Sequence, residues 1–429
     1  MQTICIRSVR AVDTVRDERC DILLENGKIS QVAATLHVDA DINIDGTSLT
    51  ALPGLFDMHV HFRDPGQTHK EDLQSGAAAA LAGGVTGVLC MPNTTPPMDD
   101  PLILKEFLKR AEETGVTVLQ AGCLTQGMQG KALADYAALR DAGAAALSDD
   151  GRPVADDALM EAAMCKAASL GIPVVSHCED LSIINGGIIN AGDIARQLDV
   201  KGMDRRSEDS ITARELSIAK KTGAPIHICH VSTKGSVELI RQAKAEGVPA
   251  TCETAPHYFM LTEEKLLTRD ADYRMNPPLR TEEDRKAIIE GILDGTIDCI
   301  ITDHAPHAPH EKADFETAPN GIVGLETSLA ATLTALYHTN RLTLQQIVQL
   351  MCVNPRTILH LPIPTLTKGA AADLVLVDTQ KQWTVDPMRL HSKSRNTAFK
   401  GMTLTGKPML TISGGIIRYR DDAFTAITY

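Results

Sequence analysis

Short apolar runs alternate with longer amphipathic stretches through the middle of the chain, from about residue 53 to residue 361. Two of these stretches, Leu102 to Glu113 and Ser236 to Glu246, have the spacing of helices with one apolar face. The apolar runs predict eight strands, which end near His61, Met91, Gly122, Ser148, His177, His230, Glu253 and Thr302. Eight such alternations over about 310 residues predict an α/β fold, a TIM (β/α)8 barrel. Thr68 and Glu71 predict a capping box for the helix after the first strand.

Both ends of the chain have β-like patterns instead. Residues 21–27 place an Asn-Gly pair after an apolar run, and residues 410–419 contain a Gly-Gly pair between two apolar runs, so both predict hairpins. Residues 372–378 predict another strand. Two separate small sheets are one interpretation. We favour one small β-sandwich module built from both termini, because the ends of a domain often lie close together. The expected division is 1–52, 53–364 for the barrel, and 365–429.

Composition narrows the class of protein. The 429 residues are 43% hydrophobic and 23% charged, as in globular proteins, and no run of about 18 apolar residues predicts a membrane span. The net charge is −13 and the basic residues are scattered, which argues against a nucleic-acid partner. The ten cysteines form no CxxC pair, and Cys90, Cys229 and Cys299 lie in β-like runs. With no secretory signal at the N-terminus, these features predict a cytoplasmic protein.

Polar residues with metal-binding chemistry lie at the ends of four predicted strands. His59 and His61 are two apart, so they share one strand face with Asp57, whose carboxylate can accept a hydrogen bond from an imidazole. A pair of hydrogen-bonded histidines would explain this motif equally well. His177 and His230 end later strands, whereas the spacing of His227 from His230 predicts a structural role for His227 on the outer face.

Asp303 ends the eighth strand, where it can bind a metal and accept a proton from metal-bound water. Four histidines and one aspartate are too many for a single tetrahedral zinc with an open position. They suit two metal ions that share a bridging ligand. Because barrel active sites lie at the C-terminal ends of the strands, the fold and this chemistry support each other.

The chain resembles the amidohydrolase superfamily, and within it the bacterial type I dihydroorotases. The resemblance covers almost the whole chain. It rests on motifs that are weak or moderate singly and specific together: Asp57-Met-His-Val-His-Phe-Arg-Asp-Pro-Gly66, Lys70-Glu-Asp72, Met91-Pro-Asn-Thr94, Ser148-Asp-Asp-Gly151, Met275-Asn-Pro-Pro-Leu-Arg280, Thr302-Asp-His-Ala-Pro-His307 and Gly324-Leu-Glu-Thr327.

The resemblance implies a ligand set for two Zn²⁺ ions, although other divalent metals also suit these donors. His59, His61 and Asp303 would hold one ion, and His177 and His230 the other. Many superfamily members bridge the two metals with a carboxylated lysine. Here the match falls on Asp150, with Asp149 as its rival, because neighbouring strand residues point to opposite faces.

The implied substrate pair is L-dihydroorotate and N-carbamoyl-L-aspartate. Arg63 can make a bidentate contact with the free carboxylate, unless it forms a surface ion pair with Asp64. Asn93 can instead serve the turn beside Pro92. We expect His304 and His310 to be solvated loop residues. The substrate contacts implied by the resemblance are His61, Arg63, Asn93, Asn276, His307, Asn320 and Gly321.

One departure from the family pattern is visible. Pro319-Asn320-Gly321 lacks the aromatic residue that often precedes this glycine, so only backbone contacts are expected from Asn320 and Gly321. The resemblance implies reversible cyclisation of N-carbamoyl-L-aspartate, the third step of pyrimidine (UMP) synthesis, with Asp303 moving the proton. It also implies a homodimer and a possible complex with aspartate transcarbamoylase.

Two other readings compete with this function. One is a hydantoinase- or allantoinase-like enzyme, against which Asp150 and the Arg63–Asn93 pair argue. The other is a non-catalytic homologue that supports aspartate transcarbamoylase, against which the complete ligand set argues.

Overall fold

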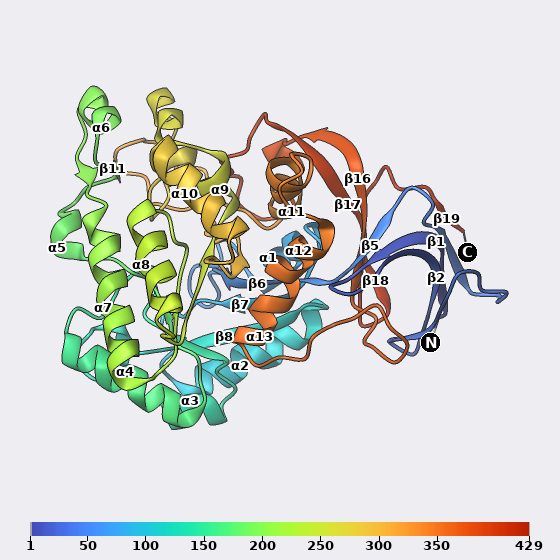
Figure 1. Cartoon of the computed structure of the whole chain (residues 1–429), viewed down its shortest axis with the longest axis horizontal. Coiled ribbons are helices and arrows are strands. Elements are labelled where there is room, and N and C mark those ends of the chain that lie inside the picture. The colour runs from blue at the N-terminus through green and yellow to red at the C-terminus, as the bar shows by residue number, and fades with distance from the viewer. Residues whose placement is uncertain (1, 429) are drawn as a thin grey trace.

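A computed structural model describes residues 2–428. It consists of a βα barrel and a β-module, which lie side by side (Figure 1). The eight parallel barrel strands form two four-stranded sheets, in the orders β6-β7-β8-β9 and β10-β13-β14-β15. Their bounds are β6 Leu55–Val60, β7 Val85–Cys90, β8 Thr117–Cys123, β9 Ala146–Ser148, β10 Val175–Ser176, β13 Ile226–Ile228, β14 Ala250–Thr254 and β15 Cys299–Ile300. All eight predicted strands are therefore confirmed.

Single bridges close the barrel at the two seams between its sheets. Leu147 pairs with Val174 at one seam, and Val60 pairs with His304 at the other. The strands β6 and β7 are buried at every position, which is the pattern of parallel strands covered on both faces. One apolar cluster fills the barrel interior below the strand ends and includes Phe56 and Leu89. The interior also holds buried polar side chains on the strands themselves, among them His227 and Glu253.

A helix follows each barrel strand and covers the outside of the barrel. The predicted helices at residues 102–113 and 236–246 are confirmed as α2 and α8. The eight covering helices are α1 Leu73–Ala82, α2 Pro101–Ala111, α3 Tyr136–Asp141, α4 Asp157–Leu170, α7 Arg206–Thr222, α8 Lys234–Ala245, α10 Glu282–Leu293 and α11 Ser328–Thr332. Three further helices complete the barrel: α9 Pro256–Met260, α12 Leu344–Val348 and α13 Asn354–Ile358. Within residues 2–428, no helix has both the length and the apolar character that a membrane crossing requires.

The start of α1 differs from the prediction. Its N-cap is Asp72, which accepts a hydrogen bond from the Ser75 backbone N–H at 2.9 Å, and Ser75 completes the capping box. The expected pair of Thr68 and Glu71 is wrong, because the chain from residue 61 to residue 72 forms a loop before the helix begins. Glu71 is instead a fully buried side chain with other partners.

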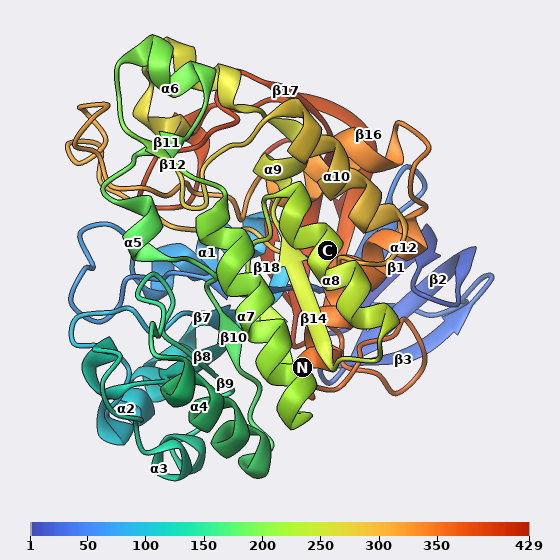
Figure 2. The ribbon, with the colours of Figure 1, turned by 60° about the vertical axis from the view of Figure 1, so that its left-hand side comes forward.

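An excursion between β10 and α7 interrupts the regular alternation. It contains α5 Leu181–Ile184, β11 Ile189–Asn190, α6 Asp193–Leu198 and β12 Gly202–Met203. Ile189 and Ala195 share a small apolar cluster with Leu266 and Phe315. Figure 2 shows this excursion at the edge of the barrel. Its two strands pair only with each other, so it adds an annex to the barrel mouth and leaves the barrel sheet unchanged.

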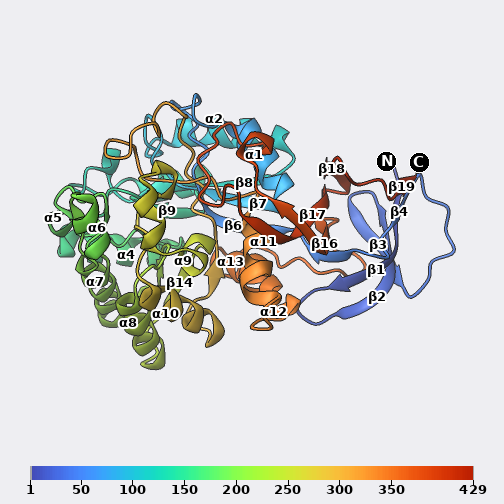
Figure 3. The ribbon, with the colours of Figure 1, turned by 90° about the horizontal axis from the view of Figure 1, so that it is seen from above.

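The β-module combines strands from both termini in one nine-stranded sheet. Strand β4 pairs with β1 and with β19, so the first and last strands of the chain lie on either side of it at the outer edge of the module (Figure 3). Strand β5 pairs with β1 from the N-terminal part and with β16 from the C-terminal part, so the interpretation of two separate sheets is wrong. The strands are β1 Ile4–Val12, β2 Asp17–Glu25, β3 Lys28–Ala33, β4 Ile42–Asp45, β5 Thr50–Pro53, β16 Leu374–Thr384, β17 Thr403–Ser413, β18 Ile416–Arg420 and β19 Ile427–Thr428.

The module differs from the expected sandwich of two sheets. Strand β1 pairs with β4 along its first half and with β5 near its end, so the sheet branches there. Ile22, Ile44 and Leu376, from three different parts of this sheet, share one apolar cluster. The two-layered packing is thus achieved by a single branched sheet. Both predicted hairpins are confirmed, one between β2 and β3 and one between β17 and β18.

Candidate active site

His59 in β6 and His61 just after it both face the barrel interior, at a point where the strand is irregular. The pairing of β6 with β7 shifts register between Asp57 and Val60. The Asp57 carboxylate accepts hydrogen bonds from the backbone N–H groups of His59, at 3.1 Å, and Thr302, at 3.3 Å. Asp57 therefore holds the backbone at this irregularity, and the expected hydrogen bond from an imidazole is wrong. Burial raises the pKa of Asp57 to about 7.

Four imidazoles surround the Asp150 carboxylate at the C-terminal mouth of the barrel. Its Oδ1 lies 3.3 Å from His177 Nδ1, 3.5 Å from His59 Nε2 and 3.7 Å from His230 Nε2. Its Oδ2 lies 3.6 Å from His61 Nε2. Burial alone would raise the pKa of Asp150, but its contacts with the imidazoles outweigh burial and hold it well below its usual value.

The cluster contains two triads of ligand atoms that meet at Asp150. His59, His61 and Asp150 form one, and Asp150, His177 and His230 form the other, with the ligand atoms of each triad within 4.8 Å of one another. Asp303 joins the first triad, with its Oδ1 3.2 Å from His61 Nε2 and 3.7 Å from His59 Nε2. A carboxylate shared by two triads is the arrangement that a bridging ligand requires.

The donor atoms of the cluster fit metal ions. Across residues 2–428, His59 Nε2 and Asp150 Oδ1 are among the few buried side-chain polar atoms with no hydrogen-bond partner. Leaving such atoms unpaired costs about 1–3 kcal/mol each. Imidazole nitrogens and carboxylate oxygens that converge without hydrogen-bond partners fit divalent cations such as zinc.

The two neighbouring aspartates after β9 point in different directions. The Asp149 carboxylate accepts hydrogen bonds from the backbone N–H groups of Leu124, at 2.8 Å, and Thr125, at 3.1 Å, and from the Thr125 hydroxyl. Burial raises the pKa of Asp149 to about 6. Asp149 thus ties two strand ends together outside the cluster, and only Asp150 lies among the histidines.

His227 and Glu253 lie beneath the cluster, inside the barrel. The Glu253 carboxylate, which is fully buried, contacts His59 Nδ1 at 2.7 Å through Oε1 and His227 Nε2 at 3.1 Å through Oε2. The prediction that His227 faces outward is wrong. It counted strand faces back from His230, but the backbone of His230 has already left the strand conformation, with φ at 31°. The sequence pattern indicates Glu253 only as the end of a strand.

Glu179 is a second carboxylate of the site that the sequence motifs do not indicate. It lies two residues after His177, and its Oε2 is 3.1 Å from His177 Nε2. Its Oε1 accepts a hydrogen bond from the side-chain amide of Asn276 at 3.0 Å. The side chain is buried. The available signal was its spacing from His177, which is the same as that between His59 and His61.

Asn93 contacts the cluster itself. Its Oδ1 lies 2.9 Å from His61 Nδ1, and its Nδ2 donates to Asp150 Oδ2 at 3.2 Å. The side chain thus orients one histidine and the shared carboxylate. The alternative role of Asn93 in the turn beside Pro92 fits Thr94 better. The backbone N–H of Thr94 donates to the Pro92 carbonyl oxygen at 2.9 Å.

Arg63 reaches over the cavity toward His307. Its Nε donates to the Pro306 carbonyl oxygen at 3.2 Å, and its Nη2 lies 3.4 Å from His307 Nε2. The alternative of an ion pair with Asp64 is wrong, because Asp64 pairs with Arg110 through two contacts of 2.8 and 2.9 Å. Within the described chain, no carboxylate lies within ion-pair distance of the Arg63 guanidinium.

The loop of Asn320 and Gly321 lies against His307. His307 Nε2 is 2.9 Å from the Asn320 carbonyl oxygen, and the Lys70 ammonium lies 3.4 Å from His307 Nδ1. Burial and the neighbouring cations lower the pKa of His307 to about 2, so the ring is neutral. Gly321 has φ at 138°, and a Cβ there would lie 2.8 Å from Ala305. Glycine is therefore required for this close approach.

His304 is buried, so the expectation of a solvated loop residue is wrong for it. Its Nε2 lies 3.2 Å from Glu71, and its Nδ1 accepts a hydrogen bond from the Gly324 backbone N–H at 3.1 Å. Glu71 also contacts the Ser392 hydroxyl. His310, by contrast, is exposed as expected.

A cavity of about 210 Å³ opens over the cluster and joins these groups. The cavity holds the members of both triads except His59, which lies at the cluster's buried side, together with Asp303 and every implied substrate contact. Its lining comprises His61, Arg63, Asn93, Asp150, Gly151, His177, His230, Asn276, Asp303, Ala305, His307, Asn320 and Gly321. A small ligand in it would touch both the metal-binding cluster and a guanidinium.

Known proteins resemble the chain over nearly its full length. A family model described as dihydro-orotase-like matches residues 49–236. The dihydroorotase of Pelobacter propionicus is 45% identical over 422 residues, which are 97% of this chain and 99% of that protein. The dihydroorotase of Syntrophus aciditrophicus is 44% identical over 425 residues, which are 98% of this chain and 100% of that protein.

The fold also resembles solved structures over nearly the whole chain. The L-hydantoinase (dihydropyrimidinase) of Arthrobacter aurescens superposes with a TM-score of 0.88 and is 28% identical, covering 97% of this chain and 96% of that one. The barrel and its histidine–aspartate cluster thus define a cyclic amidohydrolase, a hydrolase that acts on cyclic amide bonds. Because its relatives match at 44–45% identity from end to end, the chain belongs to the dihydroorotase family.

Proposed function

We propose that this protein interconverts L-dihydroorotate and N-carbamoyl-L-aspartate, the third step of pyrimidine synthesis, at a centre of two divalent metal ions. The observation that carries the proposal is the Arg63 guanidinium, which has no carboxylate partner among residues 2–428 and lines the same cavity as the two triads. A substrate with a cyclic amide and a free carboxylate needs both features. The relatives named as dihydroorotases support the same reaction.

His59, His61 and Asp303 would hold one metal ion, His177 and His230 the other, and Asp150 would bridge them. Bound there, the metal ions supply Lewis-acid chemistry and lower the pKa of a coordinated water. Zinc suits four imidazoles and two carboxylates. Metal analysis tests this part of the proposal, because two ions per chain are expected and a single ion would contradict a bridging role for Asp150.

The chain's own residues then bind the substrate and move a proton. Arg63 pairs with the free carboxylate through two hydrogen bonds, which orients the ring. In hydrolysis, water adds to the ring carbonyl carbon and Asp303 accepts the proton that this water gives up. Asp303 passes the proton to the ring nitrogen as the C–N bond breaks. In the direction of ring closure, the same carboxylate takes the proton from that nitrogen. The neutral ring of His307 and the backbone at Asn320 and Gly321 line the remaining wall.

Two alternative functions predict different results. Hydantoinases and allantoinases usually bridge their metals with a carboxylated lysine, whereas Asp150 occupies the centre of this cluster. A non-catalytic homologue that supports aspartate transcarbamoylase would be expected to lack ligands, but all six candidates converge here. A homodimer, a cytoplasmic location and a complex with aspartate transcarbamoylase remain proposals that follow from the family.

The decisive experiment is hydrolysis of L-dihydroorotate by zinc-loaded protein, with hydantoin and allantoin assayed beside it. We expect turnover of dihydroorotate alone. Arg63→Ala should raise KM for dihydroorotate about 10- to 100-fold, because a hydrogen-bonded charge contact contributes about 1.5–3 kcal/mol. The control is Arg140→Ala, which removes a guanidinium on the exposed surface of α3. Turnover of hydantoin instead, or an unchanged KM in the Arg63 variant, would contradict the proposal.

A further inference from the structure

Glu179 joins the metal-binding cluster to the loop that carries Asn276. One carboxylate oxygen contacts His177 Nε2 at 3.1 Å, and the other accepts from Asn276 Nδ2 at 3.0 Å. The two partners belong to different loops, which follow β10 and precede α10. Each is a group to which the proposed function gives a role, His177 toward the metal and Asn276 toward the substrate.

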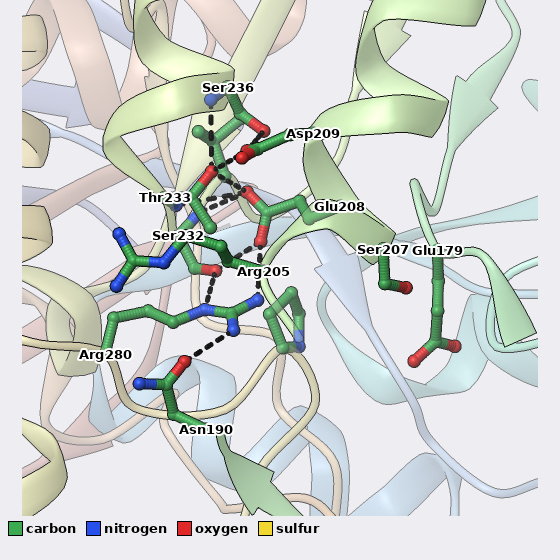
Figure 4. Close-up of polar contacts among 12 residues, drawn as sticks. Glu179, Asn190, Arg205, Ser207, Glu208, Asp209, Ser232, Thr233, Ser236 and Arg280 are labelled. Atoms are coloured by element: carbon green, nitrogen blue, oxygen red, sulfur yellow. Dashed lines mark hydrogen bonds and ion pairs between the residues drawn. The ribbon is translucent and has the colours of Figure 1, made fainter. Parts of the chain in front are cut away.

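The chain holds Glu179 firmly from both sides. His177 precedes it at the end of β10. On the other side, the Asp180 backbone N–H donates to the Ser207 hydroxyl at 2.8 Å, and that hydroxyl donates to the Asp180 carbonyl oxygen at 3.1 Å. Figure 4 shows Ser207 at the start of α7, beside Glu179. These contacts fix the backbone next to Glu179, from which its carboxylate reaches His177 and Asn276.

The Asn276 loop is fixed by a separate buried network. Arg280 ends this loop and donates to the Ser232 hydroxyl at 3.0 Å, to Asn190 at 2.8 Å and to Glu208 at 3.2 Å. Figure 4 shows Arg280 at the centre of these contacts, with the Glu179 carboxylate set apart from them. Rigid loops on both sides make the Glu179–Asn276 hydrogen bond a fixed link.

The chemistry of a carboxylate determines how both partners are oriented. An ionised carboxylate only accepts hydrogen bonds. His177 must therefore carry a proton on Nε2. In the neutral ring Nδ1 then has a lone pair directed at the cluster, where His230 Nε2 lies 2.9 Å away and Asp150 Oδ1 3.3 Å away. Asn276 must turn its amide N–H toward Glu179, so its carbonyl oxygen is the group left to the cavity.

We propose that Glu179 is a positioning residue that sets the tautomer of His177 and makes Asn276 a hydrogen-bond acceptor for substrate. The inference rests on the proposed function and adds to it the kind of substrate group that Asn276 binds. The substrate group that meets Asn276 is an N–H donor, such as the N–H of a cyclic amide or of the ureido group formed when the ring opens. A carboxylate that met this oxygen would find no donor there, because the amide nitrogen of Asn276 is turned toward Glu179.

Glu179→Gln tests the inference, because glutamine has the same shape but one acceptor and one donor. It can satisfy His177 or Asn276 in the required orientation, but not both. If its amide N–H faces His177, metal affinity falls, and changes to such supporting groups typically cost 10- to 100-fold. If it faces Asn276, the asparagine must reverse and KM for dihydroorotate rises by about 10-fold or more, with metal affinity retained.

Metal affinity is measured by competition between the protein and a chelator for Zn²⁺, and KM and kcat by dihydroorotate hydrolysis. The matched control is Asp180→Asn, which removes the neighbouring carboxylate. Asp180 caps α5 outside the cavity, and asparagine caps a helix equally well. This control should behave as wild type. Asn276→Ala keeps Glu179 and should raise KM while leaving Zn²⁺ affinity unchanged.

Wild-type values for both Zn²⁺ affinity and KM in Glu179→Gln would overturn the inference. So would a loss of Zn²⁺ affinity in Asn276→Ala, because that loss would mean that the loop, and not the carboxylate, supports the metal site. The Zn²⁺ competition needs no turnover. Failure of wild-type protein to hydrolyse dihydroorotate would therefore reject the proposed function and still leave the role of Glu179 toward His177 open to this test.

Discussion

Asp150 and Asp303 both contact the imidazole cluster, but their surroundings suit different tasks. Asp150 has four histidines within 3.7 Å and is enclosed by them. Asp303 contacts only His59 and His61 within that distance, among the described residues, and lies on the wall of the cavity. A carboxylate that is less completely surrounded can exchange a proton with a ligand, which is why we assign that role to Asp303.

Asp303→Asn should lower kcat by about 100- to 10,000-fold, the usual contribution of a positioned acid–base group. The amide keeps an oxygen that can bind a cation, so most of the metal should remain. Steady-state kinetics and metal analysis of the same samples would check this. Asp314→Asn, on an exposed loop, is the control. A variant that loses its metal while keeping its turnover would contradict the assignment.

The period of a strand predicted some side-chain directions correctly and reversed others. His59 and His61 face the same interior, as their spacing indicates. His227 was assigned to the wrong face because His230, the reference residue, has a positive φ outside the strand. Asp149 and Asp150 could not be distinguished from sequence, since only the hydrogen bonds of Asp149 to Leu124 and Thr125 show which one faces away.

At the scale of elements, the sequence predicts the regular strands and tight hairpins correctly, but it does not predict the connecting segments. Asn26 and Gly27 both have positive φ, at 52° and 73°, and Asn-Gly is the pair that favours such a turn. The predicted start of α1 is wrong because Thr68 and Glu71 have the spacing of a capping box, whereas Asp72 caps the helix in the structure. Packing decided between them, since Glu71 is buried against His304 and cannot cap a helix.

The segment between β16 and β17 reaches from the β-module to the cavity wall. Within it, the Asn396 side chain donates to the carbonyl oxygen of Gly321 at 2.9 Å and of Ala305 at 3.3 Å. It also accepts from the His307 backbone N–H at 3.2 Å. The C-terminal part of the chain thus fixes two loops that carry implied substrate contacts, which no local pattern in the sequence indicates.

Asn396→Ala should therefore impair both stability and binding. It removes the side-chain partner of the buried His307 N–H and of the Ala305 carbonyl oxygen, which costs about 1–3 kcal/mol in the free energy of unfolding. We also expect a higher KM for dihydroorotate as the loops loosen. Lys393→Ala, which removes a partly exposed ion pair with Asp72 in the same segment, should cost less than about 1 kcal/mol and leave KM unchanged. Equal effects of the two substitutions would contradict a specific role for Asn396.

At the scale of the whole molecule, the barrel and the joining of the termini followed from the sequence, but the annex and the branched sheet did not. Eight apolar runs predict eight strands because each must be buried on both faces. The annex of α5 and α6 has no such requirement, since its strands pair only with each other. The sheet branches because the first half of β1 pairs with β4 and its end pairs with β5. These pairings join residues far apart in the sequence, and the hydrophobic pattern does not predict them.

The stability of the folded chain should also depend on pH through a histidine outside the metal-binding cluster. His257, on α9, is buried, and its Nε2 has no hydrogen-bond partner among residues 2–428. Burial lowers its pKa from 6.5 to about 4. Between these values the unfolded chain binds a proton that the folded chain does not. This histidine therefore destabilises the fold progressively as pH falls from 6.5 toward 4, and has no such effect above that range.

His257→Gln, which cannot ionise in this range, should remove that dependence. The difference in unfolding free energy between wild type and variant should change with pH by up to about 1.4 kcal/mol per unit between pH 4 and 6.5, and be constant above it. Urea unfolding of both proteins in one metal state, at a series of pH values, measures this difference. His360→Gln removes an exposed histidine as the control. Parallel curves for wild type and His257→Gln would show that the buried ring takes up its proton as readily in the folded chain as in the unfolded one.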